Sequence, residues 1–162
     1  MRIGVLSDTH IHDSAEALPA RLVNDLKSVD MIIHCGDFVD LSVLEQLQQI
    51  CQRVVAVWGN MDPQELRTVL RQKEVFSVEN RKIAVTHGWG PPHKLLQIMM
   101  QEFVQEKPDI VIFGHAHEPT NQVIGGVLYF NPGSALDTIF APFNSYGIIT
   151  IGKKIDGEII KL

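Results

Sequence analysis

The chain has 162 residues, of which 45% are hydrophobic and 20% are charged. This composition excludes the disordered and fibrous classes, and the length predicts a single globular domain over residues 1–162. The formal net charge of −5 argues against a protein that follows a nucleic-acid backbone by electrostatic attraction, although bound divalent cations would reverse the field at a site.

The sequence predicts a cytoplasmic protein without membrane contact. No apolar run approaches the length that crosses a bilayer, and the N-terminus has a strand pattern instead of that of a signal peptide. The two cysteines, Cys35 and Cys51, lack the spacing of a zinc site and do not suggest a disulfide framework.

The first predicted strand, residues 1–7, is followed by Asp8-Thr9-His10. A carboxylate and an imidazole two residues apart can reach one cation, but turns also favour aspartate, so this pair is a weak signal alone. Apolar residues at helical spacing predict a helix over residues 19–29. His12, in the intervening loop, either contacts substrate or is solvated.

The second predicted strand, residues 31–35, leads into Asp37, which takes the place that Asp8 has after the first strand. His34 lies within this strand and is expected to be structural or to support a neighbouring ligand. Asp40 precedes an amphipathic helix over residues 41–47 and is expected to be its N-cap.

The third predicted strand, residues 54–58, ends at Gly59 and Asn60. We expect the glycine to permit a tight turn and the asparagine to offer a neutral amide oxygen. Pro63 fits the first turn of a helix that runs to about residue 71.

Two predicted strands, residues 74–78 and 82–86, form a hairpin whose second strand ends at His87. A helix is predicted over residues 93–105, with His93 exposed at its start.

The strand predicted at residues 110–113 is apolar throughout, as expected for a strand that is buried on both faces. Gly114 is expected to allow a tight turn that presents His115 and His117. The remaining predicted strands cover residues 122–124, 127–130, 146–151 and 158–161.

The order of the elements is βαβαβα followed mainly by strands, which predicts helices packed on layered sheets, as in a two-sheet α/β sandwich. Side chains that can bind metals follow the strand ends, where open α/β sheets place their sites. They are Asp8, His10, Asp37, Asn60, His87, His115 and His117. Seven nitrogen and oxygen donors exceed one zinc site and suit two five- or six-coordinate ions.

In this order the motifs resemble those of the calcineurin-like metallophosphoesterase family, which implies a two-sheet α/β sandwich with a dimetal site. They are D-x-H (Asp8, His10), G-D-x-x-D (Gly36, Asp37, Asp40), G-N-x-D (Gly59, Asn60, Asp62), H-G (His87, Gly88) and G-H-x-H (Gly114, His115, His117). The short chain and the run Asn131-Pro132-Gly133-Ser134 are similar to the small phosphodiesterase branch of bacteria and archaea. The resemblance covers residues 1 to about 134.

The resemblance implies two divalent ions and the hydrolysis of a small phosphodiester by a metal-bridging hydroxide. One ion is expected on Asp8, His10, Asp37 and His117, and the other on Asp37, Asn60, His87 and His115, so that Asp37 bridges. The catalytic set that goes with the hydroxide is Asp37, Asn60 and His87. Mn²⁺ is the first choice, and Ni²⁺, Fe²⁺ and Zn²⁺ suit the same donors.

One position departs from the family pattern. Many phosphatases of the family carry a histidine after the asparagine as an acid for the leaving group, and here that position is Met61, which has no proton to donate. Leaving groups of high pKa are therefore expected to be cleaved slowly. Asp62 either orients a neighbouring ligand, which we favour, or caps the following helix.

Two other functions remain as alternatives. The family contains the sorting subunit of the retromer coat, a protein-binding scaffold, but scaffold relatives lose site histidines and here no motif position is lost. A nuclease fits the chemistry, but the acidic charge and the lack of a basic or aromatic groove give it little support. A homo-oligomer through an exposed helix or the late strands is compatible with the sequence, which does not demand one.

Overall fold

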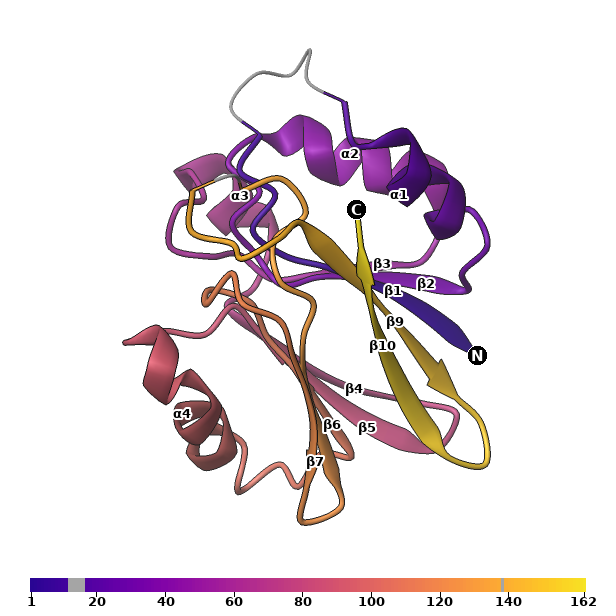
Figure 1. Cartoon of the computed structure of the whole chain (residues 1–162), viewed down its shortest axis with the longest axis vertical. Coiled ribbons are helices and arrows are strands. Elements are labelled where there is room, and N and C mark those ends of the chain that lie inside the picture. The colour runs from indigo at the N-terminus through magenta and orange to yellow at the C-terminus, as the bar shows by residue number, and fades with distance from the viewer. Residues whose placement is uncertain (12–16, 138) are drawn as a thin grey trace.

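The computed structural model describes residues 1–11, 17–137 and 139–162, which form two β-sheets with helices on their outer faces (Figure 1). The strands of the first sheet are β1 (Arg2–Leu6), β2 (Met31–His34), β3 (Val54–Ala56), β9 (Ser145–Ile151) and β10 (Ile155–Lys161). Those of the second are β4 (Lys73–Val78), β5 (Arg81–Thr86), β6 (Ile110–Ile112), β7 (Thr120–Ile124) and β8 (Val127–Asn131). The helices are α1 (Ala20–Leu26), α2 (Leu41–Ile50), α3 (Gln64–Val69), the 3₁₀ turn η1 (Pro92–Lys94) and α4 (Leu95–Glu102).

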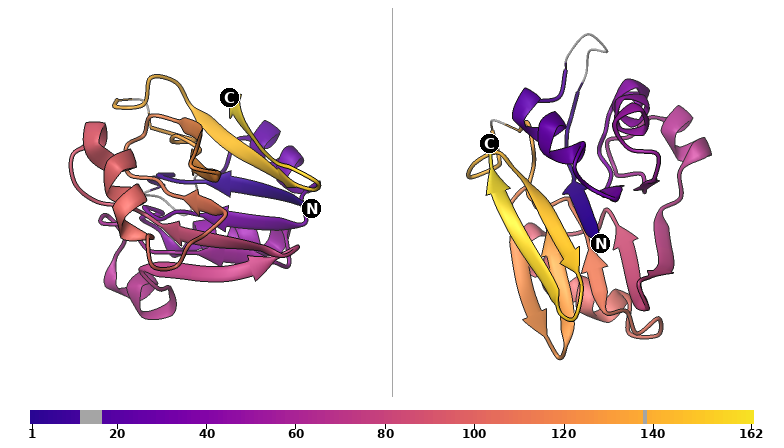
Figure 2. Two further views of the ribbon diagram at one scale, coloured as in Figure 1. Left: turned by 90° about the horizontal axis from the view of Figure 1, so that it is seen from below. Right: turned by 90° about the vertical axis from the view of Figure 1, so that its right-hand side faces the viewer.

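The strand orders are β10-β9-β1-β2-β3 and β4-β5-β6-β8-β7. Three neighbouring strands in each sheet are parallel, namely β1, β2 and β3 in one and β5, β6 and β8 in the other. The predicted two-sheet α/β sandwich is therefore confirmed. Figures 1 and 2 show α1 and α2 on the outer side of the first sheet and α4 on the outer side of the second.

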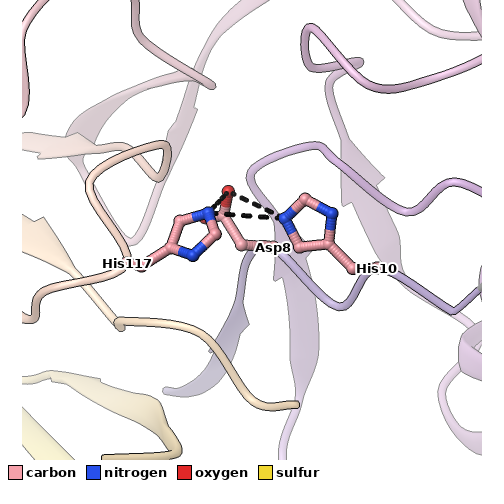
Figure 3. A group of neighbouring side chains, drawn as sticks. All are labelled: Asp8, His10 and His117. Carbon is pink, nitrogen blue, oxygen red and sulfur yellow. Dashed lines mark hydrogen bonds and ion pairs between the residues drawn. The ribbon is translucent and has the colours of Figure 1, made fainter. Parts of the chain in front are cut away.

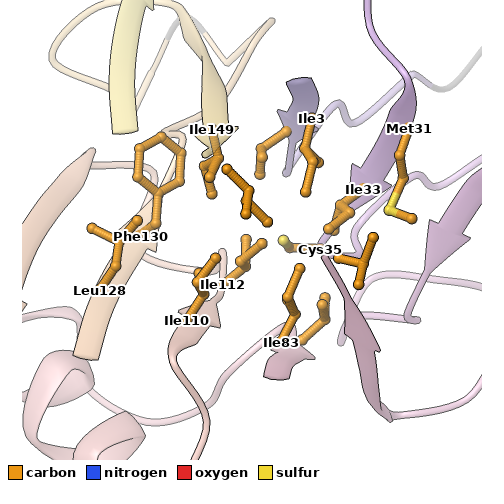
Figure 4. Close-up of a cluster of buried hydrophobic side chains, with 14 of the residues drawn as sticks. Ile3, Met31, Ile33, Cys35, Ile83, Ile110, Ile112, Leu128, Phe130 and Ile149 are labelled. Atoms are coloured by element: carbon orange, nitrogen blue, oxygen red, sulfur yellow. The ribbon is translucent and has the colours of Figure 1, made fainter. Parts of the chain in front are cut away.

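Alternating side chains divide the core into layers. On β2, Met31 and Ile33 join the cluster between the two sheets (Figure 4), whereas Ile32 joins the cluster under α1 and α2. This follows from the period of two along a strand, and it explains why residues 3–6 of β1 and 31–33 of β2 show no alternation of polar and apolar side chains. A third cluster, which includes Val111 and Met99, fills the space between the second sheet and α4.

Several predicted boundaries were wrong. The helix predicted to reach residue 71 ends at Val69, because Arg71 pairs with Val57 as an isolated bridge and its carbonyl accepts the N–H of Trp58 at 3.0 Å. Strand β10 begins at Ile155 instead of residue 158, since its pairing with β9 starts opposite Ile151.

The other boundary errors also lie at element ends. Strand β7 begins at Thr120 instead of residue 122, and the helix predicted over residues 93–105 is η1 followed by α4. Asp40 is the N-cap of α2, as predicted, and its side chain accepts the N–H of Ser42 at 2.8 Å. Within the described ranges, no helix has the length and apolar character that spanning a membrane requires.

Candidate metal centre

Five loops bring the predicted ligands together where the parallel strands of both sheets end. These loops follow β1, β2, β3, β5 and β6. They carry all seven ligand-type residues, namely Asp8, His10, Asp37, Asn60, His87, His115 and His117. The sheets meet here directly, since the N–H of His115, after β6 of the second sheet, donates to the carboxylate of Asp8, after β1 of the first, at 3.0 Å.

The backbone of these loops is left-handed at five of the ligand positions. Asp8, His10, Asp37, His115 and His117 have φ values of 51°, 48°, 57°, 68° and 54°. Residues with side chains rarely adopt this region, and each such residue costs of order 1–3 kcal/mol unless its surroundings hold it. Here the loops hold one another, because Asp8 donates its N–H to the carbonyl of Gly36 at 3.0 Å and His10 donates its N–H to that of Asp37 at 3.1 Å.

Two glycines make room for the carboxylates. A Cβ on Gly59 would lie 2.2 Å from Asp37 Oδ1, and one on Gly114 would lie 1.8 Å from Ser7 Oγ and 2.8 Å from Asp8 Oδ2. Neither glycine has a positive φ. The tight turn expected at Gly59 is present, since its carbonyl accepts the N–H of Asp62 at 3.4 Å, but what both glycines provide is space and not a left-handed conformation.

The first group of donors is Asp8, His10 and His117 (Figure 3). Asp8 Oδ1 lies 3.2 Å from His117 Nε2 and 3.8 Å from His10 Nε2, and the two ring nitrogens are 3.4 Å apart. These three atoms come from loops that are 107 residues apart in the sequence, and they face a common point.

The second group contains Asp8, Asp37 and His87. His87 Nε2 lies 3.3 Å from Asp37 Oδ2 and 3.9 Å from Asp8 Oδ1. Asn60 Oδ1 completes the group, at 3.0 Å from both His87 Nε2 and His115 Nδ1.

Both carboxylates lie between the two groups of donors. Asp37 Oδ2 is also 4.0 Å from His10 Nε2, so Asp37 and Asp8 each reach imidazoles of both groups. One oxygen of each carboxylate is anchored by a backbone N–H, that of Met61 on Asp37 Oδ1 and that of His115 on Asp8 Oδ2. The other oxygen of each faces the histidines.

The donor set fits divalent metal ions. Carbonyl oxygens only accept hydrogen bonds, so Cys35 O at 2.7 Å and Gly90 O at 3.0 Å take the N–H of His87 and of His115. In the unprotonated form, the other ring nitrogen of each histidine directs its lone pair at Asn60 Oδ1. Electron pairs that converge in this way need a cation or a proton between them.

Asp8 Oδ1 is the clearest sign of such a fit. Asp8 is fully buried, yet this oxygen has no hydrogen-bond partner among the described residues. Burial alone raises the pKa of Asp8, but its contacts with His10 and His117 outweigh that effect and hold the pKa well below its usual value. A buried, ionised oxygen that makes no hydrogen bond and is surrounded by imidazole nitrogens at 3.2 to 3.9 Å is the atom that a metal ion would satisfy.

The histidines carry complementary shifts. The contact with Asp8 raises the pKa of His117 to about 9, against an opposing effect of burial. Burial lowers the pKa of His87, but Asp37 and Asp8 more than reverse this, so the net shift is upward. The carboxylates thus favour positive charge at this place, whether a proton or a metal ion supplies it.

Asp62 orients the loop of Asp37. Its carboxylate accepts the N–H of Asp37 at 3.0 Å, of Gly59 at 2.8 Å and of Val39 at 2.8 Å. Helix α3 starts instead from Pro63 with no side-chain cap, so these hydrogen bonds favour the orienting role over the capping one.

Asp137 is a supporting residue that the sequence analysis missed. Its carboxylate forms a short contact with His117 Nδ1, on the far side of the ring from Asp8. Carboxylates often hold the outer nitrogen of a metal-binding histidine in this way. Asp137 lies in an irregular loop 20 residues beyond His117, and neither its spacing nor a local motif marks it.

None of the other histidines that the structure describes belongs to the two groups of donors. His34 is fully buried, its Nδ1 accepts the N–H of Gly36 at 3.1 Å, and its ring stacks on Phe38, which makes it structural as expected. His93 is exposed in η1. His12 lies outside the residues that the structure describes.

A pocket of about 480 Å³ opens over the donors. His10, Asp37, Asn60, His115 and His117 line it. Its walls carry Met61, Pro92, Ala116, Asp137, Ile139 and Phe140. The ligand-type atoms are therefore accessible from outside although the carboxylates themselves are buried.

Comparison with known proteins places the chain in a family. Residues 1–154 match the model of the calcineurin-like phosphoesterase superfamily domain. A probable metallophosphoesterase of Methanocaldococcus jannaschii is 35% identical over all of this chain and 82% of its own. The solved structure of an archaeal phosphodiesterase is 27% identical, covers 100% of both chains and has a TM-score of 0.78. Vps29 of Entamoeba histolytica, solved with Zn²⁺, has the same fold, with 22% identity, 99% coverage of both chains and a TM-score of 0.78.

Proposed function

The chain belongs to the calcineurin-like phosphoesterase superfamily, and on this premise we propose that it is a metal-dependent phosphodiesterase in which residues 1–162 act as one domain. The observation that carries the proposal is the buried Asp8 Oδ1. It has no hydrogen-bond partner among the described residues and faces ring nitrogens of His117, His10 and His87 at 3.2, 3.8 and 3.9 Å.

Two divalent ions are the proposed cofactors. One would be held by Asp8, His10, Asp37 and His117, and the other by Asp37, Asn60, His87 and His115. Mn²⁺ is our first choice, and Ni²⁺, Fe²⁺ and Zn²⁺ suit the same nitrogen and oxygen donors. When bound, such ions supply the positive charge that activates water and neutralises phosphate oxygens.

The protein's own groups prepare this site. The Asp62 carboxylate accepts the N–H of Asp37 at 3.0 Å, and Asp37 Oδ1 accepts the N–H of Met61 at 2.7 Å. Because both its backbone and its side chain are held, the Asp37 carboxylate needs no rearrangement when it acts. Asn60 contributes an uncharged oxygen, which limits the negative charge that opposes an anionic substrate. Asp137 holds the outer nitrogen of His117 and so fixes the direction of its inner one.

The pocket favours diesters with good leaving groups. Met61 lines it and is 53% exposed, but its thioether cannot protonate a departing oxygen. A leaving group that is stable as an anion needs no such proton. Because the pocket is open, it can receive a phosphorus centre with a substituent on either side.

The scaffold alternative is favoured by the likeness to Vps29. The structure of the Entamoeba histolytica protein, at 22% identity, shows a shared fold alone. The Schizosaccharomyces pombe protein is 27% identical over 83% of this chain. A chain that served only as a scaffold would have no need to keep Asp8 Oδ1 buried and ionised without a partner, so we favour the enzyme. We also propose a cytoplasmic location, in keeping with free thiols at Cys35 and Cys51.

The test is hydrolysis of bis(p-nitrophenyl) phosphate and of p-nitrophenyl phosphate with manganese, nickel, zinc or a chelator. We expect metal-dependent cleavage, faster for the diester, and its loss in Asp37→Asn. Asp40→Asn is the matched control, since Asp40 is the N-cap of α2 and asparagine caps a helix equally well. Wild-type protein that binds two ions and cleaves neither ester would contradict the proposal and favour the scaffold.

A further inference from the structure

Three large apolar side chains on the pocket wall are exposed to solvent. Met61 is 53% exposed, Ile139 79% and Phe140 76%, and all three line the pocket over the proposed metal ligands. Scattered apolar residues on a surface are ordinary, but a group of them around a concave polar site indicates a binding surface.

The loop that carries two of them is tied to the site. The Asp137 carboxylate, which contacts His117, also accepts the N–H of Ile139 at 2.8 Å, of Phe140 at 3.1 Å and of Ala141 at 3.0 Å. The Phe140 ring stands edge-on to that of His117, with the ring centroids 6.1 Å apart. One carboxylate thus fixes both a proposed metal ligand and the apolar wall beside it.

Met61 extends the apolar wall from a second loop. Its N–H binds Asp37 Oδ1 at 2.7 Å, so its side chain starts directly beside a proposed ligand. Arg67 holds this loop through the carbonyls of Asn60 at 2.9 Å and Asp62 at 2.8 Å.

The pocket has no fixed positive charge for a second anionic group. Among the described residues that line it there is no lysine or arginine, and Asp37 and Asp137 contribute carboxylates. The guanidinium of Arg67 is engaged by the two carbonyls of its own loop. A substituent that carries further phosphates or a carboxylate would therefore find no lysine or arginine to pair with on the wall formed by Met61, Ile139 and Phe140.

We propose that Met61, Ile139 and Phe140 form a subsite for an uncharged aromatic substituent of a phosphodiester that bears a single negative charge. This inference rests on the proposed function and names its substrate class. An aromatic ring matches the edge-on Phe140 and the flexible Met61 thioether, both of which make favourable contacts with rings. An aryl ester also suits the missing acid, since an aryloxide departs with its bonding electrons and takes a proton from water afterwards.

Competitive inhibition tests the subsite without depending on which oxygen leaves. Ethyl methylphosphonate and benzyl methylphosphonate carry the same charge, and they differ only in that a phenyl ring replaces a methyl group in the benzyl ester. Both would compete with bis(p-nitrophenyl) phosphate. We expect the benzyl ester to inhibit the manganese-loaded wild-type protein about tenfold more strongly, from partial burial of one ring. A 4-carboxybenzyl ester should lose this advantage.

Substitutions localise the effect. Phe140→Ala should reduce the benzyl-to-ethyl preference to about twofold to threefold, and adding Ile139→Ala should abolish it. Val123→Ala is the matched control, because Val123 is 67% exposed on β7 and does not line the pocket. Equal inhibition by both esters would overturn the subsite, and so would a benzyl preference that survives both substitutions. Turnover of bis(p-nitrophenyl) phosphate would still support the proposed phosphodiesterase activity in either case.

If the wild-type protein turned over no ester, the proposed function would fail, and calorimetry would then measure binding of the two phosphonates to manganese-loaded protein. A benzyl preference that Phe140→Ala removes would support the subsite as a binding site. Equal affinities would overturn it and leave Ile139 and Phe140 as a contact for a protein partner.

Discussion

Replacing Asp62 with asparagine should destabilise the protein although Asp62 is not a proposed metal ligand. The Asp62 side chain is buried and accepts three backbone N–H groups, two on Oδ2 and one, from Val39, on Oδ1. An asparagine can keep its oxygen in the place of Oδ2, but its amide NH₂ then faces the N–H of Val39. A buried donor without an acceptor, in place of a hydrogen bond to a charged group, costs about 2–3 kcal/mol.

Val39 adds to this cost. Its φ of 73° is unusual for a β-branched residue, and the hydrogen bond to Asp62 is one of the contacts that hold it there. For a chain of this length each kcal/mol corresponds to about 2–4 °C, so the melting temperature should fall by about 4–12 °C. Thermal and urea unfolding, both with a chelator present, would measure the change without a contribution from bound metal.

Asp40→Asn serves as the control, because it makes the same chemical change at a helix N-cap that asparagine satisfies. Its effect should stay within about 0.5 kcal/mol. If Asp62→Asn unfolded at the wild-type temperature, the three hydrogen bonds would not be what holds the loop of Asp37, and the orienting role of Asp62 would have to be abandoned.

Three further predictions concern the surroundings of the site. Asp137→Asn should weaken manganese binding about 10–100-fold in competition with a fluorescent chelator, because His117 loses its charged outer partner, and an unchanged affinity would contradict this role. Gly114→Ala should cost about 3 kcal/mol or prevent folding, since its Cβ would lie 1.8 Å from Ser7 Oγ, whereas Gly152→Ala, with no atom nearer than 4.0 Å, should be tolerated in the same unfolding assay. Burial lowers the pKa of His34 from 6.5 to about 3, so between these pH values the unfolded chain binds a proton that the folded chain does not. The free energy of unfolding, measured with a chelator present, should therefore fall by about 1 kcal/mol per pH unit as the pH drops from 6.5 towards 3. His34→Asn should flatten that slope, and an equal slope in the variant would rule out His34 as its source.

Local patterns were sufficient to predict the strands and the proposed ligands. Apolar runs mark the buried strands, and parallel strands carry the residues that follow them to a common edge. The ends of β1 and β2 therefore lie side by side, with Leu6 opposite His34, and this brings Asp8 and Asp37 together. Asp40 was predictable for a similar reason, because an N-cap acts on its own helix.

The features that the sequence did not reveal depend on residues that are far apart in the chain. Gly114 is needed because Ser7 lies against it, and no pattern around either residue contains the other. Asp137 reaches His117 through a loop whose path is set by the surrounding structure. The end of α3 was misjudged because Arg71 pairs with Val57 of the neighbouring strand segment, and this pairing overrides helix propensity.

The two carboxylates show how the site and the fold depend on each other. Asp8 Oδ2 accepts the N–H of His115, which follows a strand of the second sheet. Asp37 Oδ1 accepts the N–H of Met61, which follows a strand of the first sheet. The Asp8 carboxylate, which places negative charge at the site, therefore also joins the two sheets at this edge. A charge buried for ligand binding alone would weaken the fold, because its desolvation is not repaid by one hydrogen bond. Because the Asp8 carboxylate fixes the left-handed loop of His115 and the Asp37 carboxylate fixes the loop of Met61, removal of either should disturb positions of both donor groups at once, and ligand substitutions at this edge should not act independently.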